Sequence, residues 1–321
     1  MRFFTFKGLL LTTIFMLLGC LSIQAEDDEL ITKQVTVKLD EAGTLPDKIG
    51  SAKKYKITNL KIIGEINGTD WRMIRDMAGR NVSHDETEGN LSELDLSDAS
   101  IVPGGDYYIT CAYFGYPSKI HTSHQVIGDL AFEGCSGLTS LKLPSDIRLI
   151  GRHAFEGCSG LTSITLPSGV TEIGSSAFYG CSGLTSITLP SGVTWIGHSA
   201  FEGCSGLTSI TLPSGVTEIG ESAFANCSGL TSIYVYAEKM PKLRTNMFDG
   251  CDAKKCTVYV PKGTYDDYWL SEFGYFENIV EFDPTDINNV ITSNDAKELS
   301  RYSLNGQRLS APTKGLNIVK Y

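Results

Sequence analysis

Residues 150–172 read IGRHAFEGCSGLTSITLPSGVTE, residues 173–195 read IGSSAFYGCSGLTSITLPSGVTW, and residues 196–218 read IGHSAFEGCSGLTSITLPSGVTE. The chain therefore repeats itself with a period of 23 residues, and five such units cover residues 127–241. A unit of this length buries its apolar face only when neighbouring units stack on it, which is typical of solenoids. The repeat decides the fold class.

Each unit is predicted to contain two extended segments joined by turns. Residues 162–166 alternate apolar and polar side chains with period two, as does a strand with one buried face. Pro167 cannot donate to a strand ladder and Gly169 tolerates positive φ, so Pro-Ser-Gly should end this strand and turn the chain. Residues 170–173 form a second short extended segment, and Gly180 permits a corner. We predict a mostly parallel β solenoid with short helical or irregular turns, capped at both ends.

The segments on either side of the units resemble caps. Residues 91–96 and, more weakly, 57–62 repeat the L-x-x-L-x-L phrase, so residues 26–126 are predicted to hold an N-terminal cap and degenerate repeats. Residues 35–39 alternate like an edge strand, and residues 103–124 look like one distorted repeat with a surface loop. A helix is predicted between the two phrases, with Asp70 as its N-cap and Met73, Ile74 and Met77 on its buried face.

On the C-terminal side, residues 242–283 are predicted to form a capping repeat. Its aromatic side chains cover the last coil; they are Tyr265, Tyr268, Trp269, Phe273, Tyr275 and Phe276. Residues 284–300 are polar and form a linker. Residues 301–321 are a short tail module, in which Asn305-Gly306 between alternating runs predicts a hairpin.

Residues 1–25 have the pattern of a secretory signal peptide. Arg2 and Lys7 precede and flank an apolar run that is too short to span a bilayer as a mature helix. Two processing sites are compatible with this pattern: a lipobox ending at Cys20, which would then be acylated, and ordinary cleavage after Ala25. Either way the chain is predicted to be exported, and a lipid on Cys20 is the one membrane attachment that the sequence offers.

The repeat phrase I-G-x-x-A-F-x-G-C-S-G-L-T-S-I-T-L-P-S-G-V-T-x-I-G resembles the BspA-like leucine-rich repeats of bacterial surface proteins. Residues 258–263 (VYVPKG) and 278–281 (NIVE) resemble their C-terminal cap. The resemblance covers about residues 30–283. It implies a cell-surface or secreted solenoid of a Gram-negative bacterium with a role in adhesion. Residues 302–319 resemble the short terminal modules of exported proteins of anaerobic Gram-negative bacteria.

Composition argues against several function classes. The formal net charge is -10 and the pI about 5, the wrong sign for binding nucleic acid or an anionic lipid surface. Five His residues are present, and His121 and His124 are the one close pair, without further ligands nearby in sequence. No Ser lies in a G-x-S-x-G nucleophile motif. We therefore predict neither catalytic residues nor a metal or cofactor.

The nine Cys residues are not spaced as a disulfide framework. The five at Cys135, Cys158, Cys181, Cys204 and Cys227 take the same apolar position in successive units. They are predicted to form a ladder of buried thiols that act as small hydrophobic groups, because parallel side chains in equivalent positions oppose disulfide geometry. Whether Cys251 and Cys256 pair with each other stays open, as does bridging within the ladder.

The outward face of the strands is the remaining candidate for function. Alternation directs Ser163, Thr165, Ser186, Thr188, Ser209 and Thr211 outward, with Tyr234 at one end of the rows. One interpretation is a solvated surface that prevents sheet stacking. The other is a binding strip for an extracellular protein or glycan, with specificity from positions that vary between units, namely Trp195, Tyr179 and His198. A structural envelope or spacer protein without a defined ligand is the alternative function.

Overall fold

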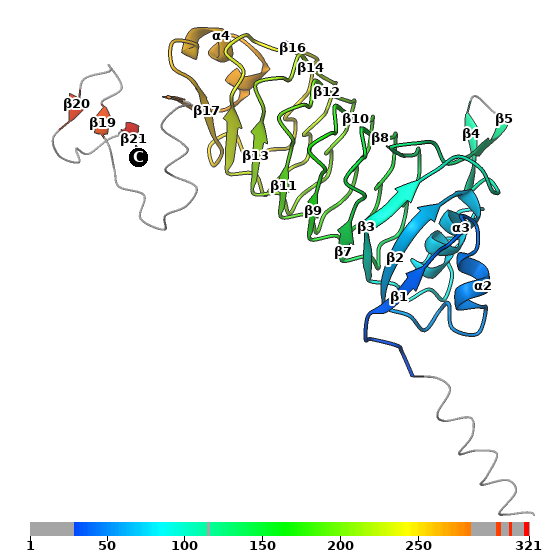
Figure 1. Ribbon diagram of the computed structural model, residues 1–321. Helices are drawn as coiled ribbons and strands as arrows, with labels where there is room; N and C mark the ends of the chain where they lie inside the picture. The colour runs from blue at the N-terminus through cyan, green and yellow to red at the C-terminus, as the bar shows by residue number, and fades with distance from the viewer. Residues whose placement is uncertain (1–28, 114–115, 284–299, 303–307, 310–317, 321) are drawn as a thin grey trace, which may run out of the picture.

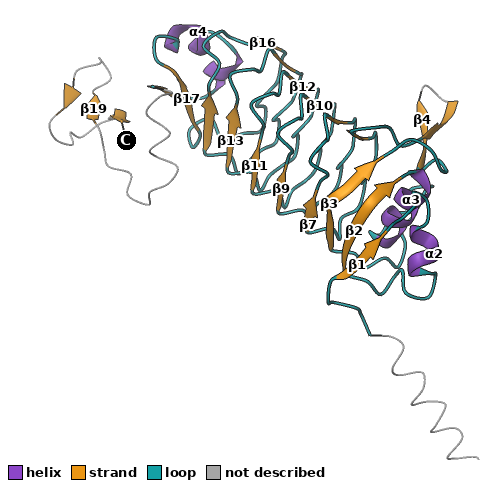
Figure 2. Cartoon of the chain, in the orientation of Figure 1, coloured by secondary structure: helices purple, strands orange, loops and turns teal. Residues whose placement is uncertain are grey.

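The computed structural model describes residues 29–113, 116–283, 300–302, 308–309 and 318–320, and residues 29–283 wind into a solenoid of stacked coils (Figure 1). One side of the stack is a ten-stranded parallel sheet, and a six-stranded parallel sheet runs along a second side. Helices lie at the two ends of the stack and are absent from the coils between β6 and β16 (Figure 2). The predicted fold class is confirmed.

The first sheet has the order β1-β2-β3-β7-β9-β11-β13-β15-β17-β18. Its strands are β1 (Val35–Lys38), β2 (Asn59–Ile66), β3 (Glu93–Ile101), β7 (Ser140–Lys142), β9 (Ser163–Thr165), β11 (Ser186–Thr188), β13 (Ser209–Leu212), β15 (Ser232–Val235), β17 (Thr257–Pro261) and β18 (Asn278–Phe282). The second sheet comprises β6 (Val126–Ile127), β8 (Leu149–Ile150), β10 (Glu172–Ile173), β12 (Trp195–Ile196), β14 (Glu218–Ile219) and β16 (Lys242–Leu243). β4 (Ile109–Tyr113) and β5 (Tyr116–Ile120) pair antiparallel in a separate two-stranded sheet, which projects from the N-terminal part of the stack in Figure 1.

Each coil of the regular region pairs with the next in a register of 23 residues, so Ile164 lies beside Ile187 and Glu172 beside Trp195. Threonines reinforce this pairing: the hydroxyl of Thr185 donates to the carbonyl of Thr162, 3.1 Å away, and that of Thr194 to Thr171, 3.3 Å away. The same bond recurs in other coils. The repeated Thr thus joins neighbouring coils as well as facing solvent.

A column of phenylalanine rings runs through the corner of the stack. Phe178 stacks on Phe155 at 5.0 Å between centroids and on Phe201 at 5.2 Å, with nearly parallel planes. The column comprises Phe132, Phe155, Phe178, Phe201, Phe224 and Phe248, all buried. Trp71 closes one end, 5.3 Å from Phe132, and Phe276 packs on Phe248 at the other. The core is therefore continuous from cap to cap.

The cysteines of the ladder lie beside this column as free, fully buried thiols. The Sγ atom of Cys181 donates to the carbonyl of Phe155, 3.0 Å away, and Cys204 repeats the bond to Phe178 at 3.1 Å. Burial raises the pKa of Cys181 to about 12. Cys251 and Cys256 are free thiols as well, so the local pair that the sequence left open is not formed in the structure.

Two positions in each coil have positive φ. Gly180, which the sequence predicted at a corner, has a φ of 68°, and Asn226 takes the equivalent place with 58°. The second position, occupied by Ser176 at 55° and its equivalents, was not predicted. Gly169, in contrast, does not have positive φ. A Cβ atom on Gly169 would lie 3.2 Å from the carbonyl oxygen of Ile147, so close contact between coils accounts for this glycine.

The N-terminal cap contains α2 (Leu45–Ile49) and α3 (Gly68–Met77), with β1 on the edge of the first sheet as predicted. The N-cap of α3 is Asn67 and not Asp70, which was the predicted cap. The buried Asp70 carboxylate instead accepts from the backbone N–H groups of Asn67, Gly43 and Leu45. Asp70 therefore holds α2 against α3 in addition to completing the capping box.

The C-terminal cap consists of α4 (Tyr265–Trp269) and the 3₁₀ helix η1 (Glu272–Tyr275). Half of the predicted aromatic cover is buried: Tyr268, Phe273 and Phe276. Tyr265, Trp269 and Tyr275 are exposed, in contrast to the expectation that they cover the last coil. A short turn of helix has one face for the core, so it cannot bury Tyr268 and Trp269 together.

Three short strands of the tail, β19 (Ser300–Tyr302), β20 (Arg308–Leu309) and β21 (Ile318–Lys320), pair antiparallel in the order β20-β19-β21. The predicted Asn305-Gly306 turn, the signal peptide of residues 1–25 and Cys20 lie outside the described residues. Within the described part of the chain, no helix has the length and apolar character needed to cross a bilayer.

Candidate binding surface

The outward face of the first sheet carries two rows of side chains in register. One row is serine in five successive strands: Ser140, Ser163, Ser186, Ser209 and Ser232. The other contains Thr165, Thr188, Thr211 and Tyr234. In β9 and β11 both outward residues are exposed, while the Ile between them is buried. Ser209, Thr211 and Tyr234 are half-buried but lie on the same face.

The rows are charged at their N-terminal end. Lys142 continues the threonine row and lies beside Asp95 of β3, with 3.0 Å between Nζ and Oδ2. Lys61 of β2 pairs with Asp98 at 2.6 Å. Burial alone would raise the pKa of Asp95, but hydrogen bonds from Ser97 and Lys142 outweigh it and lower the pKa to about 2. This end of the sheet is therefore a network of fixed opposite charges.

The same rows become aromatic at their C-terminal end. Tyr234 of β15 stacks on Tyr259 of β17 with ring centroids 4.6 Å apart and planes 8° from parallel. Tyr236 packs edge-on against Phe282 at 5.3 Å. Burial, followed by the neighbouring Tyr234, raises the pKa of Tyr236. The face thus changes along its length from charged to hydroxyl-lined to aromatic.

Trp195, Tyr179 and His198 are not on this face. Trp195 lies in β12 of the second sheet, between Glu172 and Glu218 of its neighbouring strands. It lines a shallow cavity of about 400 Å³ that also includes Asp129, Arg152 and Glu172. The structure therefore separates Trp195 from the serine and threonine rows with which the sequence analysis grouped it.

Tyr179 and His198 lie outside both sheets. The Tyr179 ring, 40% exposed, belongs to the turn that follows Phe178. His198 follows β12, and its Nδ1 atom accepts from the backbone N–H of Glu221 at 3.1 Å. The variable positions of the repeat thus lie on different sides of the coil. The binding role of each stays a prediction.

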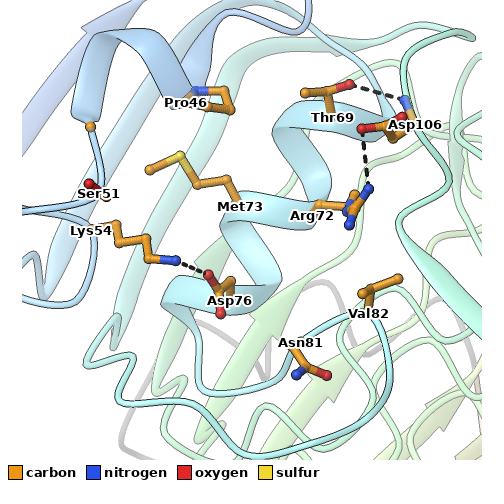
Figure 3. A pocket seen from close by; sticks show the side chains of 11 residues that line it. Pro46, Ser51, Lys54, Thr69, Arg72, Met73, Asp76, Asn81, Val82 and Asp106 are labelled. Carbon is orange, nitrogen blue, oxygen red and sulfur yellow. Dashed lines mark hydrogen bonds and ion pairs between the residues drawn. The ribbon is translucent and has the colours of Figure 1, made fainter.

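A pocket in the N-terminal cap was not predicted from the sequence (Figure 3). It has a volume of about 370 Å³ and lies between α2, α3 and the loop that contains Asp106. Its charged side chains pair with one another: Lys54 with Asp76, and Arg72 with Asp106 at 3.2 Å. Burial lowers the pKa of Lys54, but hydrogen bonds with Asp76 and Tyr55 outweigh it and raise the pKa. Because these charges neutralise each other, the pocket offers little net charge to a ligand.

Neither histidines nor thiols of the described residues form a reactive cluster. His121 and His124 are exposed, and His121 packs against the edge of Tyr107 at 6.4 Å. Within the described ranges, no three His, Cys, Asp or Glu side chains are placed to hold a metal ion together. Cys111, in the hairpin strand β4, has its pKa raised by burial and by Asp129.

Comparison with known proteins identifies the repeats. Residues 125–255 match the family model described as the BspA type leucine rich repeat region, in six copies. The match extends past the five predicted units to residue 255, and β16 continues the second sheet there in a register that is one residue longer, with Glu218 paired to Lys242. No curated protein matches the chain.

Solved structures that resemble the chain are leucine-rich repeat proteins. One from T. pallidum is 40% identical over 35% of this chain and 52% of that chain, with a TM-score of 0.34. One from Bacteroides ovatus is 35% identical over 54% of this chain and 44% of that chain, with a TM-score of 0.40. A leucine rich cell surface protein from Faecalibacterium prausnitzii is 24% identical over 62% of this chain and 51% of that chain, with a TM-score of 0.32. The chain spans about half the length of these structures. Residues 125–255 are therefore similar to BspA type leucine rich repeats.

Proposed function

We propose that the chain is an exported, non-catalytic binding protein whose outward first-sheet face engages an extracellular protein, in an adhesin-like role. The observation that carries this proposal is the in-register face itself, which runs from Lys61 and Asp95 through the hydroxyl rows to Tyr234 and Tyr259. The signal-peptide pattern of residues 1–25 and the family resemblance support export and adhesion.

The chemistry of the face favours a protein over a strongly charged ligand. Serine and tyrosine are the residues that antibody paratopes use most, because hydroxyls adapt their hydrogen bonds and a Tyr ring gives large contact area at low entropic cost. The central hydroxyl rows hold no charged side chain between Lys142 and Tyr259. We therefore expect binding to depend weakly on salt unless the ligand also reaches Lys61 and Asp95.

The test is a binding screen of the purified chain against immobilised extracellular-matrix proteins and, in parallel, a glycan array. Thr188→Arg places a bulky charge in the middle of the face and should lower the affinity for the captured ligand at least tenfold. Trp195→Ala and Tyr179→Ala lie on other sides of the coil and should bind normally if this face alone holds the ligand; weaker binding by either variant would support the role predicted for that residue from the sequence.

Three results would count against the proposal. Loss of binding in Trp195→Ala with retention in Thr188→Arg would move the site to the second sheet. Binding to glycans but to none of the proteins would show that the ligand is a glycan and not a protein. Absence of any ligand in both screens would favour the alternative of an envelope or spacer protein.

A further inference from the structure

The C-terminal cap exposes several large apolar side chains to solvent. Leu270 is 85% exposed, Trp269 45% and Tyr265 39%. The rings of Tyr265 and Trp269 are 7° from parallel with centroids 6.1 Å apart, and Leu270 follows Trp269 directly as the C-cap residue of α4. Contiguous exposed apolar surface of this kind marks an interaction site.

This apolar surface is surrounded by negative charge. Residues 262–283 contain six carboxylates and the single basic residue Lys262. Three of the carboxylates, Asp266, Asp267 and Glu272, belong to α4 and η1, and none of the three forms an ion pair with a described residue. We call the three apolar and three acidic residues the cap patch. Its occupant should be basic and should carry apolar side chains.

The chain itself contains such a segment. Residues 300–321 carry Arg301, Arg308, Lys314 and Lys320 and no carboxylate side chain, and they include Leu304, Leu309, Leu316, Ile318 and Val319. Strands β19 to β21 are two or three residues long and pair only with one another. A sheet this small needs a further apolar surface to be stable in water.

The connection between the two segments is short enough to favour contact. Sixteen residues, 284–299, separate the described end of the cap from β19. A connection of this length reaches at most about 55 Å when extended. Two segments joined by a connection of this length meet at a high effective concentration, so a weak contact suffices to keep the tail bound.

We propose that residues 300–321 dock on the cap patch of the same chain, with their basic side chains beside Asp266, Asp267 and Glu272 and their apolar side chains on Trp269 and Leu270. The docked tail shields the apolar end of the solenoid from other molecules. This inference concerns the end of the stack and does not depend on the ligand proposed for the sheet face.

Zero-length carbodiimide coupling of the full chain tests the proposal, because it joins Lys to a carboxylate only when the two are in contact. Mass spectrometry should find Lys314 or Lys320 joined to Asp266, Asp267 or Glu272, within one chain, at all protein concentrations. Raising NaCl from 20 mM to 500 mM should lower the yield at least fivefold.

A double variant, Trp269→Ser with Leu270→Ser, retains all three carboxylates and should lower the same yield at least threefold. Tyr179→Ser, which removes a ring of similar exposure on a distant coil, should leave the yield unchanged. As a second measurement, Arg301→Glu with Lys320→Glu should increase the oxidation of Trp269 by hydroxyl radicals, measured by mass spectrometry, and leave that of Trp195 unchanged.

Coupling of the tail lysines to carboxylates over the whole solenoid in proportion to exposure would overturn the proposal. Coupling found only between isotopically labelled and unlabelled chains would overturn it equally, by assigning the patch to a second copy.

Discussion

The N-terminal third, residues 29–126, and the regular coils, residues 127–241, belong to one continuous core but are stabilised differently. All of the buried polar or charged residues of the described chain lie in the N-terminal third: Asp70, Arg75, Asp95 and Thr122. The coils bury only apolar side chains and thiols. Irregular segments leave backbone groups that side chains must satisfy, whereas identical coils satisfy them by pairing with each other.

Arg75 illustrates the first kind of stabilisation. Its guanidinium is fully buried and donates from Nη1 to the carbonyls of Leu130 and Ala131, at 2.6 and 3.0 Å. Trp71 adds a bond from its indole N–H to Ala131. These contacts join α3 to the first regular coil. Side chains of α3 supply the donors that bind the carbonyls of Leu130 and Ala131 in this coil. The four predictions below test this difference.

Phe178→Ala should have the largest effect, because it opens a cavity in the middle of the phenylalanine column. Large-to-small changes of this kind destabilise by about 3–5 kcal/mol. Urea denaturation measures the loss, with Tyr179→Ala as the control; that neighbouring exposed ring should change stability by less than about 0.5 kcal/mol. A small effect of Phe178→Ala would show that the column does not stabilise the coils.

Arg75→Met should destabilise by about 3 kcal/mol, since it leaves buried carbonyls of the first coil without donors while retaining apolar volume. Arg72→Met, which removes the exposed pair with Asp106, should cost less than about 1 kcal/mol. The same denaturation experiment compares them. Equal stability of the two variants would mean that the N-terminal third does not rely on its buried polar contacts.

Asp95 should make the N-terminal third less stable at low pH. Its pKa is lowered to about 2 in the folded chain, so its contribution is complete above the ordinary pKa of about 4 and is lost as pH falls through 2. The contribution amounts to about 2 kcal/mol. Asp95→Asn should therefore be less stable than wild type at pH 7, and the difference should shrink below pH 4 and disappear as pH falls through 2. The exposed Glu238→Gln is the control, and parallel pH profiles for wild type and Asp95→Asn would contradict this assignment.

Cys181→Ala should have the smallest effect, about 1 kcal/mol, because it removes one sulfur atom and a weak hydrogen bond. The wild-type thiol, with its pKa raised to about 12 by burial, should react with iodoacetamide at neutral pH only on unfolding. Rapid alkylation of Cys181 in the native chain would show that the coils open locally.

The sequence predicted the coils well because their information is local and repeated. Twenty-three-residue periodicity set the register, and alternation within residues 162–166 placed Ser163 and Thr165 outward, as observed. The repeat alignment also determines on which side of the coil Trp195 and Tyr179 lie, although the prediction did not use it. Trp195 aligns with Glu172, within the second predicted extended segment, and this alignment alone separates it from the hydroxyl rows.

The polar contacts of the N-terminal third could not be predicted in the same way. Asp70 accepts from Gly43 and Leu45, 27 and 25 residues earlier, and Trp71 donates to Ala131, 60 residues later. No periodicity in the sequence relates these positions, so these contacts could not be predicted. The residues next to Asp70 alone suggested that it was the N-cap of the helix. The pocket of Lys54 and Arg72 was missed for the same reason, since its lining comes from separate segments.

The phenylalanine column also bears on how long the stack can be. Trp71 contacts only the first ring of the column, Phe132, and Phe276 contacts only the last, Phe248. Neither contact depends on the number of rings between them. A stack with one coil more or fewer, inserted or removed in register, would therefore keep the same contacts at both ends.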